Sequence, residues 1–155
     1  MKLAAPQLLQ LEHQELHHFI VRATSEPGAL GEAARLVDRL LKAHVSKEEA
    51  FALPPLSLLG PLARGKLDRD MAQVLAQTDW LKAHQLDMIA EHHAVNGALE
   101  QLIAAARAAD RVEYIEFAER LINHARMEEE ILYPAAILVG EYLKVKLGLA
   151  SALHP

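Results

Sequence analysis

The chain has 155 residues, 52% of them hydrophobic, and carries a formal net charge of −5 with a pI near 6.0. The acidic balance argues against nucleic acid or an anionic membrane surface as the main partner, and no apolar run approaches the roughly 20 residues of a membrane-spanning helix. Because there is no cysteine, disulfides, thiolate metal sites and cysteine nucleophiles are excluded. We expect a single cytoplasmic domain over residues 1–155 with its core at about 7–134.

The spacing of the apolar residues predicts an all-α chain. Its four main helices are predicted at residues 7–24, 30–53, 68–109 and 112–133. The first ends at the turn Ser25-Glu26-Pro27-Gly28, and Pro54-Pro55 stops the second because proline removes a helical N–H group. Thr78-Asp79 is a candidate capping pair that would interrupt the third helix. An additional C-terminal helix is predicted at residues 135–147.

One motif recurs at an offset of 80 residues. The paired positions are His44 and His124, Glu48 and Glu128, Glu49 and Glu129, and Pro54 and Pro134. Residues four apart share a helical face, so each copy presents an imidazole beside a carboxylate. Short connections favour an up-down-up-down four-helix bundle. The offset then relates its two halves by a pseudo-twofold axis that brings both His–Glu pairs to one centre.

The inward faces of the predicted helices carry six groups that are costly to bury without a partner. They are His13, His44, Glu48, His92, His124 and Glu128. These faces supply no Lys or Arg for ion pairing, so a bound metal explains all six together. Imidazole and carboxylate ligands without sulfur suit iron, manganese or zinc, and two carboxylates from equivalent positions can bridge two ions. The residues therefore predict a dinuclear centre, with iron preferred.

On the third predicted helix, two adjacent histidines compete for the ligand position. His93 lies at the repeat offset of 80 from His13, but its face of the helix is polar. His92 shares its face with Val95 and Leu99. Because a ligand to a buried metal must point into the core, this apolar stripe favours His92.

The order of these motifs resembles the hemerythrin-like, HHE cation-binding family over about residues 11–134. The shared features are a His on helix one, His-x-x-x-Glu on helix two, Glu-His on helix three and His-x-x-x-Glu-Glu closing on Leu-Tyr-Pro. The resemblance implies a non-heme di-iron centre, oxo- or hydroxo-bridged, with one coordination position open to O₂. It also implies four terminal ligands and two bridging carboxylates. The terminal ligands would be His13, His44, His92 and His124, and the bridges Glu48 and Glu128.

Two departures separate the chain from the oxygen carriers of that family. Asn96 stands where the third helix of the carriers has a second histidine. Glu128 follows its histidine by four residues, where the carriers have an Asp at five. These departures favour the sensing, storage or redox members of the family. His17, four residues after His13, is the candidate for the additional imidazole ligand.

Three further side chains are expected near the centre. Glu49 and Glu129 point about 100° away from the ligand face, which favours hydrogen bonds or ion pairs to the ligand imidazoles over direct coordination. For Tyr133, an ordinary packing role is favoured over a hydroxyl directed at the site.

The leading functional hypothesis is a small di-iron protein that binds O₂ or a related small ligand, in sensing, storage or a stress response. One alternative is an enzyme that acts on peroxide or nitric oxide at the same centre. Another is a structural or interaction bundle stabilised by metal, in which the Ala-rich segment 135–147 is the candidate surface for a homodimer. One set of ligands serves all three, so the sequence leaves the choice open.

Overall fold

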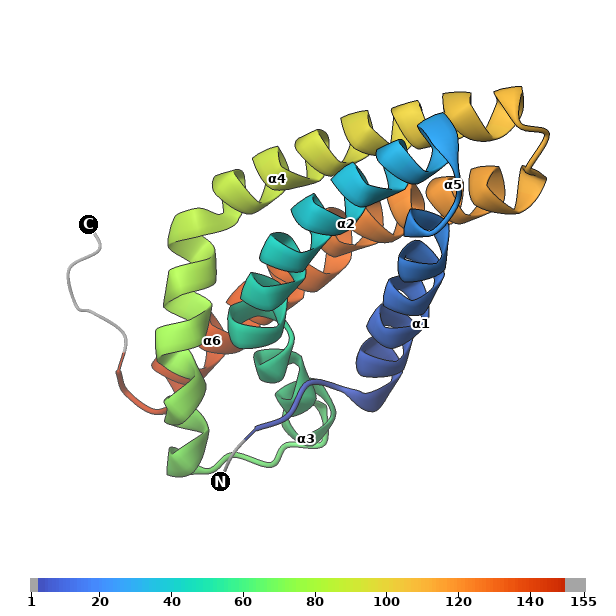
Figure 1. The fold of residues 1–155 in the computed structure, drawn as a ribbon. Helices are drawn as coiled ribbons and strands as arrows, with labels where there is room; N and C mark the ends of the chain where they lie inside the picture. Colours follow the sequence, from blue (N-terminus) through green and yellow to red (C-terminus); the bar gives the residue numbers. More distant parts are fainter. Residues whose placement is uncertain (1–2, 150–155) are drawn as a thin grey trace.

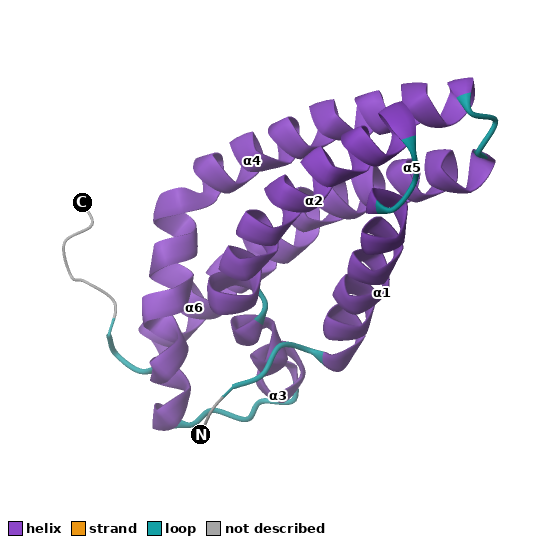
Figure 2. Cartoon of the chain, viewed as in Figure 1, coloured by secondary structure: helices purple, strands orange, loops and turns teal. Residues whose placement is uncertain are grey.

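The computed structural model describes residues 3–149, and every regular element in that range is helical (Figure 2). The long helices of the bundle are α1 (Gln7–Thr24), α2 (Gly28–Lys47), α4 (Leu75–Ala108) and α5 (Val112–Met127). Helix α2 packs against α1 and α4, and α5 packs against α4 and α1 (Figure 1). The chain is therefore an all-α protein of four packed helices, and this order of neighbours is consistent with an up-down arrangement.

Shorter elements connect and extend the long helices. They are the π-helical turn η1 (Glu48–Ala52), the 3₁₀ turn η2 (Pro54–Leu58), α3 (Leu59–Ala63), the 3₁₀ turn η3 (Arg69–Val74), the π-helical turn η4 (Glu128–Leu132) and α6 (Tyr133–Lys146). The helical run that begins with α2 ends before Pro54-Pro55, where the sequence predicts a stop. At the start of η3, the Asp68 carboxylate accepts a hydrogen bond from the backbone N–H of Asp70 at 2.9 Å.

The C-terminal helix is not a separate fifth member of the bundle, so the predicted additional helix is corrected. Helices α5, η4 and α6 follow one another without a break from Val112 to Lys146, and α6 continues the line of α5 in Figure 1. Pro134 lies in the first turn of α6, where the wide turn before it leaves room for the proline ring. The fourth helix is thus longer than the sequence predicts.

The predicted break at Thr78-Asp79 is also wrong, because α4 continues through both residues. The Thr78 side chain is buried and its hydroxyl donates to the carbonyl of Leu75 at 3.3 Å. A Cβ at Gly140 of α6 would lie 2.1 Å from Thr78 Oγ1, so the two helices pack closely here. Asp79 accepts a hydrogen bond from Lys144 at 2.5 Å. Both residues therefore serve the contact between α4 and α6.

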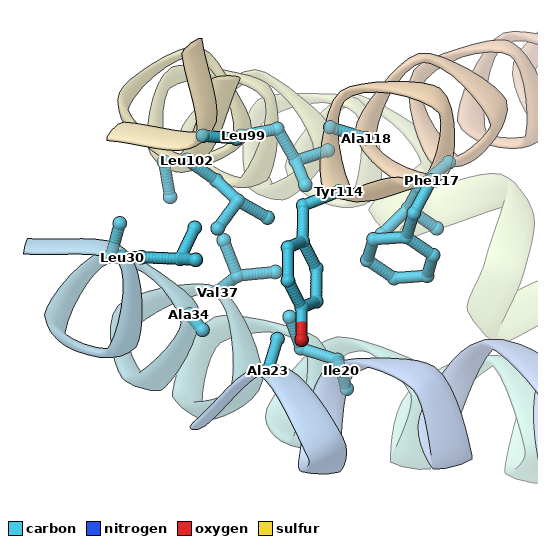
Figure 3. Close-up of a cluster of buried hydrophobic side chains, with 14 of the residues drawn as sticks. Ile20, Ala23, Leu30, Ala34, Val37, Leu99, Leu102, Tyr114, Phe117 and Ala118 are labelled. Atoms are coloured by element: carbon cyan, nitrogen blue, oxygen red, sulfur yellow. The ribbon is translucent and has the colours of Figure 1, made fainter. Parts of the chain in front are cut away.

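Three apolar clusters fill the interior of the described part of the chain, and two of them adjoin the His- and Glu-rich region. The larger one joins α1, α2, α4 and α5, and Figure 3 shows the Tyr114 side chain reaching from α5 toward Ile20 and Ala23 of α1. The second cluster contains Leu53, Leu81, Met88 and Tyr133, among other residues. Within residues 3–149, no helix is both long and apolar enough to cross a membrane.

Candidate metal centre

Both copies of the repeated motif form a π-helical turn that begins on the inward glutamate. The carbonyl of Glu48 accepts from the N–H of Leu53, and that of Glu128 from the N–H of Tyr133, each five residues on. A proline follows each turn, and a proline ring clashes with the carbonyl four residues earlier in a regular α-helix. The wider turn relieves this clash, and such turns are frequent at functional sites.

The six inward groups predicted from the sequence meet in the centre of the bundle. All six are buried, with exposed fractions between 1% for Glu48 and 7% for His13. They form two groups, in each of which the potential ligand atoms lie within 4.8 Å of one another. The first group is His44, Glu48, His92 and Glu128, and the second is His13, His124 and Glu128. The structure thus contains two buried His/Glu groups, each able to hold a metal ion.

Both carboxylates extend between the two groups. Oε1 of Glu48 lies 2.9 Å from His44 Nε2, while its Oε2 lies 3.6 Å from Nε2 of His13. Oε1 of Glu128 lies 3.4 Å from His92 Nε2 and 3.5 Å from His124 Nε2, and its Oε2 faces His13 at 3.7 Å. Each carboxylate therefore offers oxygen to both groups, which is the arrangement that a bridging ligand requires.

All four histidines turn Nε2 inward and Nδ1 outward, and at every Nδ1 stands a carboxylate from another helical element. Three of these contacts are hydrogen bonds. His44 reaches Glu91 at 2.8 Å, His92 reaches Glu129 at 2.8 Å, and His124 reaches Glu12 at 3.0 Å. The fourth is looser, with 3.9 Å between His13 Nδ1 and Glu49. A carboxylate at Nδ1 fixes the ring and leaves the Nε2 lone pair free for a metal.

The outer carboxylates obey the same pseudo-twofold relation as the inner groups. His44 and His124 are 80 residues apart. Their partners, Glu91 for His44 and Glu12 for His124, are 79 residues apart. The other two pairs, His13 with Glu49 and His92 with Glu129, are related by offsets of 79 and 80. The sequence predicts this supporting role for Glu49 and Glu129. It gives no such role to Glu12 and Glu91, although each directly precedes a buried histidine.

Tyr133 contributes a hydroxyl to the centre in addition to packing. Its side chain is fully buried, and its O–H donates a short hydrogen bond to Glu48 Oε1. The same oxygen lies 3.2 Å from His44 Nε2 and 3.3 Å from His92 Nε2. Burial and the nearby charge of Glu48 raise the pKa of Tyr133 above its ordinary value, so the phenol is a neutral donor when no metal is bound. The packing role favoured from the sequence is therefore incomplete.

The structure does not bring His17 into either group. His17 lies one helical turn after His13 on α1, but its side chain is exposed and lies at the edge of a cavity next to the site. Of the two candidates on α4, His92 is buried in the first group, whereas His93 is exposed. Six of the seven predicted ligands thus converge. The exception is His17, which the sequence offers as the additional imidazole.

The electrostatics of the cluster are those of imidazoles held against carboxylates. Burial alone would lower the pKa of His92, but hydrogen bonds to Glu128 and Glu48 outweigh it and raise that pKa to about 10. For His124, burial is likewise outweighed by Glu128 and Glu12, and the pKa rises to about 9. Burial acts to raise the pKa of Glu128, yet hydrogen bonds from His124, His13 and His92 lower it well below the ordinary value. Without metal, the cluster therefore retains protons on its histidines.

One buried atom shows how well a cation fits this set. Oε2 of Glu128 is buried and has no hydrogen-bond partner. An unpaired carboxylate oxygen is costly to bury, and a cation on the inner side of the cluster would satisfy it. Four imidazoles and two carboxylates are also a donor set suited to iron, manganese or zinc. The residues present therefore fit a pair of metal ions.

Comparison with known proteins finds no match: no protein-family model, no curated protein and no solved structure matches the chain. The resemblance to hemerythrin-like proteins accordingly stays a prediction from the motifs. The structure itself shows an all-α bundle with two buried His/Glu groups that share a carboxylate.

Proposed function

We propose that the chain is a non-heme di-iron protein of the hemerythrin-like type that binds O₂ or a related small ligand. The observation that carries the proposal is the sharing of Glu48 and Glu128 between two groups of histidines. In this assignment His44 and His92 hold one ion, His13 and His124 hold the other, and the two glutamates bridge them. Bound iron would supply reversible one-electron chemistry and an exchangeable position for a small ligand.

The two halves of the centre are unequal, and this supports ligand binding on one side. Each half has two histidines and shares both glutamates, but the Tyr133 hydroxyl contacts only the half that contains His44 and His92. The residue equivalent to Tyr133 at the 80-residue offset is Leu53, which has no polar group to offer. The side of His13 and His124 therefore has one protein oxygen fewer, which favours this side for an added ligand.

The protein residues also determine what surrounds that ligand. The apolar clusters next to the site lower the local dielectric constant, which strengthens electrostatic interactions inside it. Four imidazoles and only two carboxylates give a less negative centre than a set dominated by carboxylates. This balance favours binding of a small ligand over accumulation of iron as mineral.

Metal quantitation of the protein as purified under anaerobic conditions, followed by optical spectra with O₂ and azide, tests the proposal. We expect about two irons per chain and a charge-transfer band characteristic of an oxo-bridged pair. His124→Ala should abolish iron binding, while His18→Ala, an exposed histidine of α1, should leave it unchanged. A His124→Ala protein that still holds two irons would overturn the assignment. Function that survives removal of metal, with only thermal stability reduced, would favour a structural role.

The Tyr133 hydroxyl favours a second candidate function, in which the same centre turns over peroxide or nitric oxide. Such chemistry requires a proton source close to the reacting ligand, and Tyr133 supplies a neutral O–H that contacts Glu48, His44 and His92. Peroxide consumption by the iron-loaded protein, compared with Tyr133→Phe at equal iron content, separates the two functions. Rapid turnover that depends on Tyr133 supports the enzyme, and stable O₂ binding without turnover supports the carrier or sensor.

A further inference from the structure

A cavity of about 340 Å³ adjoins the candidate metal centre and lies mainly between α1 and α2. All four histidines of the centre border this cavity, and so do both shared glutamates. Its edge is polar and reaches solvent at Gln14, His17, Lys42 and Ser46. The cavity therefore connects the surface of the protein with the site.

Beyond the histidines, the wall of the cavity is apolar. The aliphatic side chains that line it are Leu16, Ile20, Leu41, Val45, Val95 and Leu121. Most of them lie three residues from one of the buried histidines, as Leu16 does from His13 and Val95 from His92, so they stand one helical turn away on the same face. A ligand in the cavity would meet the centre at one end and hydrocarbon along the rest of its length.

The cavity is much larger than a diatomic ligand requires. An apolar cavity of about 150 Å³ is large enough to bind benzene, and this one has roughly twice that volume. Binding sites for small organic molecules begin at about 300 Å³ and are mostly apolar. We infer that the cavity binds an aliphatic chain of roughly six to eight carbons beside the metal centre. The inference deepens the proposed function. It rests on that function only in one respect, namely that the inner end of the aliphatic chain meets a metal ion.

Straight-chain carboxylates provide the test. Acetate, butyrate, hexanoate and octanoate would be titrated into the metal-loaded protein by calorimetry, with metal content measured on the same sample. Each buried methylene contributes on the order of 0.8 kcal/mol, so we expect the affinity to rise about fourfold per added carbon until the cavity is full. A flat series in protein that holds two irons and binds azide would overturn the inference and leave the proposed function intact.

Variants of the wall show whether the chain-length effect arises in this cavity. Leu41→Trp should fill part of it and flatten the series while acetate and azide still bind, and Val45→Trp provides the same test if the first variant does not fold. Leu11→Trp, at an exposed position of α1 that does not line the cavity, should keep the full series. A series unchanged in both wall variants would overturn the inference. Chain-length dependence in protein that binds no metal would instead overturn the proposed function and leave the cavity assignment standing.

A different observation concerns the outer face of α6. Apolar side chains stand exposed there at Leu138, Tyr142 and Val145, and beside the helix at Ile131 of η4 and at Leu149 after its end, with exposed fractions between 43% and 68%. Leu138, Tyr142 and Val145 are spaced by four and three residues, which keeps them on one side of α6 and is typical of helices that pair. No other part of residues 3–149 covers these side chains, since their exposure is measured with that part of the chain in place.

The neighbouring helix α4 enlarges this face. The pairs Lys82–Glu141 and Lys144–Asp79 set α4 and α6 antiparallel, and the same register, continued, brings Leu86, 80% exposed, opposite the position before Leu138. Six exposed apolar side chains at roughly 100 Å² each make a patch on the order of 600 Å², the upper limit for a typical monomer. Two such patches together reach about 1,200 Å², the lower end of specific interfaces. We also propose that this face binds the same face of a second copy of the chain.

Sedimentation or light scattering over a range of protein concentrations measures the oligomeric state. We expect a dimer that Leu138→Glu and Val145→Glu convert to a monomer, because each variant introduces two unpaired charges into the interface. Leu8→Glu, at a still more exposed leucine on α1, should remain dimeric. A wild-type monomer at all concentrations, or a dimer that survives both α6 variants, would overturn the proposal.

Discussion

Glu91 of α4 accepts a hydrogen bond from Nδ1 of His44 on α2 at 2.8 Å, although the next residue in the chain, His92, is itself one of the four buried histidines. Glu12 makes the equivalent contact with His124 on α5. Adjacent residues on a helix point about 100° apart, so the histidine of each Glu-His pair faces the centre while the glutamate reaches sideways. Each pair thus supports a histidine on a neighbouring helix and ties two helices together at the site.

This relationship predicts that the outer carboxylates control metal affinity without coordinating the metal. Glu91→Gln and Glu12→Gln keep the shape of the side chain but weaken the hold on the imidazole, and loss of such partners typically costs 10- to 100-fold in affinity. We expect a decrease of that size in competition titrations with a chelator, with metal stoichiometry unchanged. Glu130→Gln, whose carboxylate pairs with Arg126 on the surface, should bind as the wild type does. Equal affinities in all four proteins would contradict the supporting role.

The raised pKa values predict how the stability of the metal-free protein depends on pH. The pKa values of His92 and His124 are about 10 and about 9 in the folded protein, above the ordinary value of 6.5. Between pH 6.5 and about 10, the folded state binds more protons than the unfolded state. The stabilisation is therefore complete below pH 6.5 and disappears as the pH rises toward 10, at about 1.4 kcal/mol per pH unit for each proton involved. Thermal denaturation of the metal-free protein from pH 6 to 10 measures this decrease, and a constant or rising stability would contradict it.

Metal must displace the same protons, so binding should release them. A neutral imidazole is the form that ligates a metal, and the apparent affinity should therefore rise with pH over the range in which the metal-free stability falls. Calorimetric titration of metal in buffers of different ionisation enthalpy counts the protons released. A titration at pH 7 that releases none would show that the histidines are already neutral.

The sequence predicts the centre well where helical periodicity alone decides which way a side chain points. His44 and Glu48 must share a face in any helix, and the copy at His124 and Glu128 must do the same, so the inner groups follow from spacing. The partners of Nδ1 depend on which helices become neighbours and on their relative rotation. Helical periodicity determines neither of these, so it gives no supporting role to Glu12 and Glu91. The repeated Glu-His pair is the available signal.

Tyr133 illustrates a second limit. Five residues apart, Glu128 and Tyr133 would point about 140° away from each other in an α-helix, so the sequence suggests that the phenol leaves the site. In the π-helical turn the carbonyl of Glu128 bonds the N–H of Tyr133, and the extra residue in the turn rotates the phenol back toward the centre. The long α4 and the fusion of α5 with α6 reflect the same kind of limit. Packing against Gly140 overrides the capping tendency of Thr78, and the wide turn lets the helix continue into Pro134.

Removal of the Tyr133 hydroxyl should affect the metal-free and metal-loaded proteins differently. In the metal-free protein, Tyr133→Phe removes one of two hydrogen-bond partners of the buried Glu48 Oε1 and leaves it His44 Nε2 at 2.9 Å, which costs about 1–3 kcal/mol. Bound metal can satisfy that oxygen, so the loss of stability should be smaller in the loaded protein. Chemical denaturation of both forms measures the difference. Equal losses with and without metal would show that the hydroxyl contributes only through packing.

The exposed position of His17 predicts that it is not required for metal binding. His17→Ala removes an imidazole at the edge of the cavity, outside both groups of potential ligands, and should retain two irons per chain. His13→Ala removes a buried member of the smaller group and should lose at least one. Metal quantitation of the two variants side by side decides the matter, and loss of metal from His17→Ala would restore the additional imidazole predicted from the sequence.

The close approach of Gly140 to Thr78 predicts opposite effects for two Gly→Ala substitutions in helices. At Gly140 a new methyl group would lie 2.1 Å from Thr78 Oγ1 and 2.6 Å from its Cβ, so α6 must move away from α4, at a cost of about 1–3 kcal/mol. At Gly97 of α4 an added Cβ meets nothing within 4 Å, and the higher helix propensity of alanine should stabilise the protein by about 1 kcal/mol. Urea denaturation of both variants measures the two effects. Combining Gly140→Ala with Thr78→Ala should recover part of the loss, because it removes the atoms that the new methyl group meets, and no recovery would place the strain elsewhere.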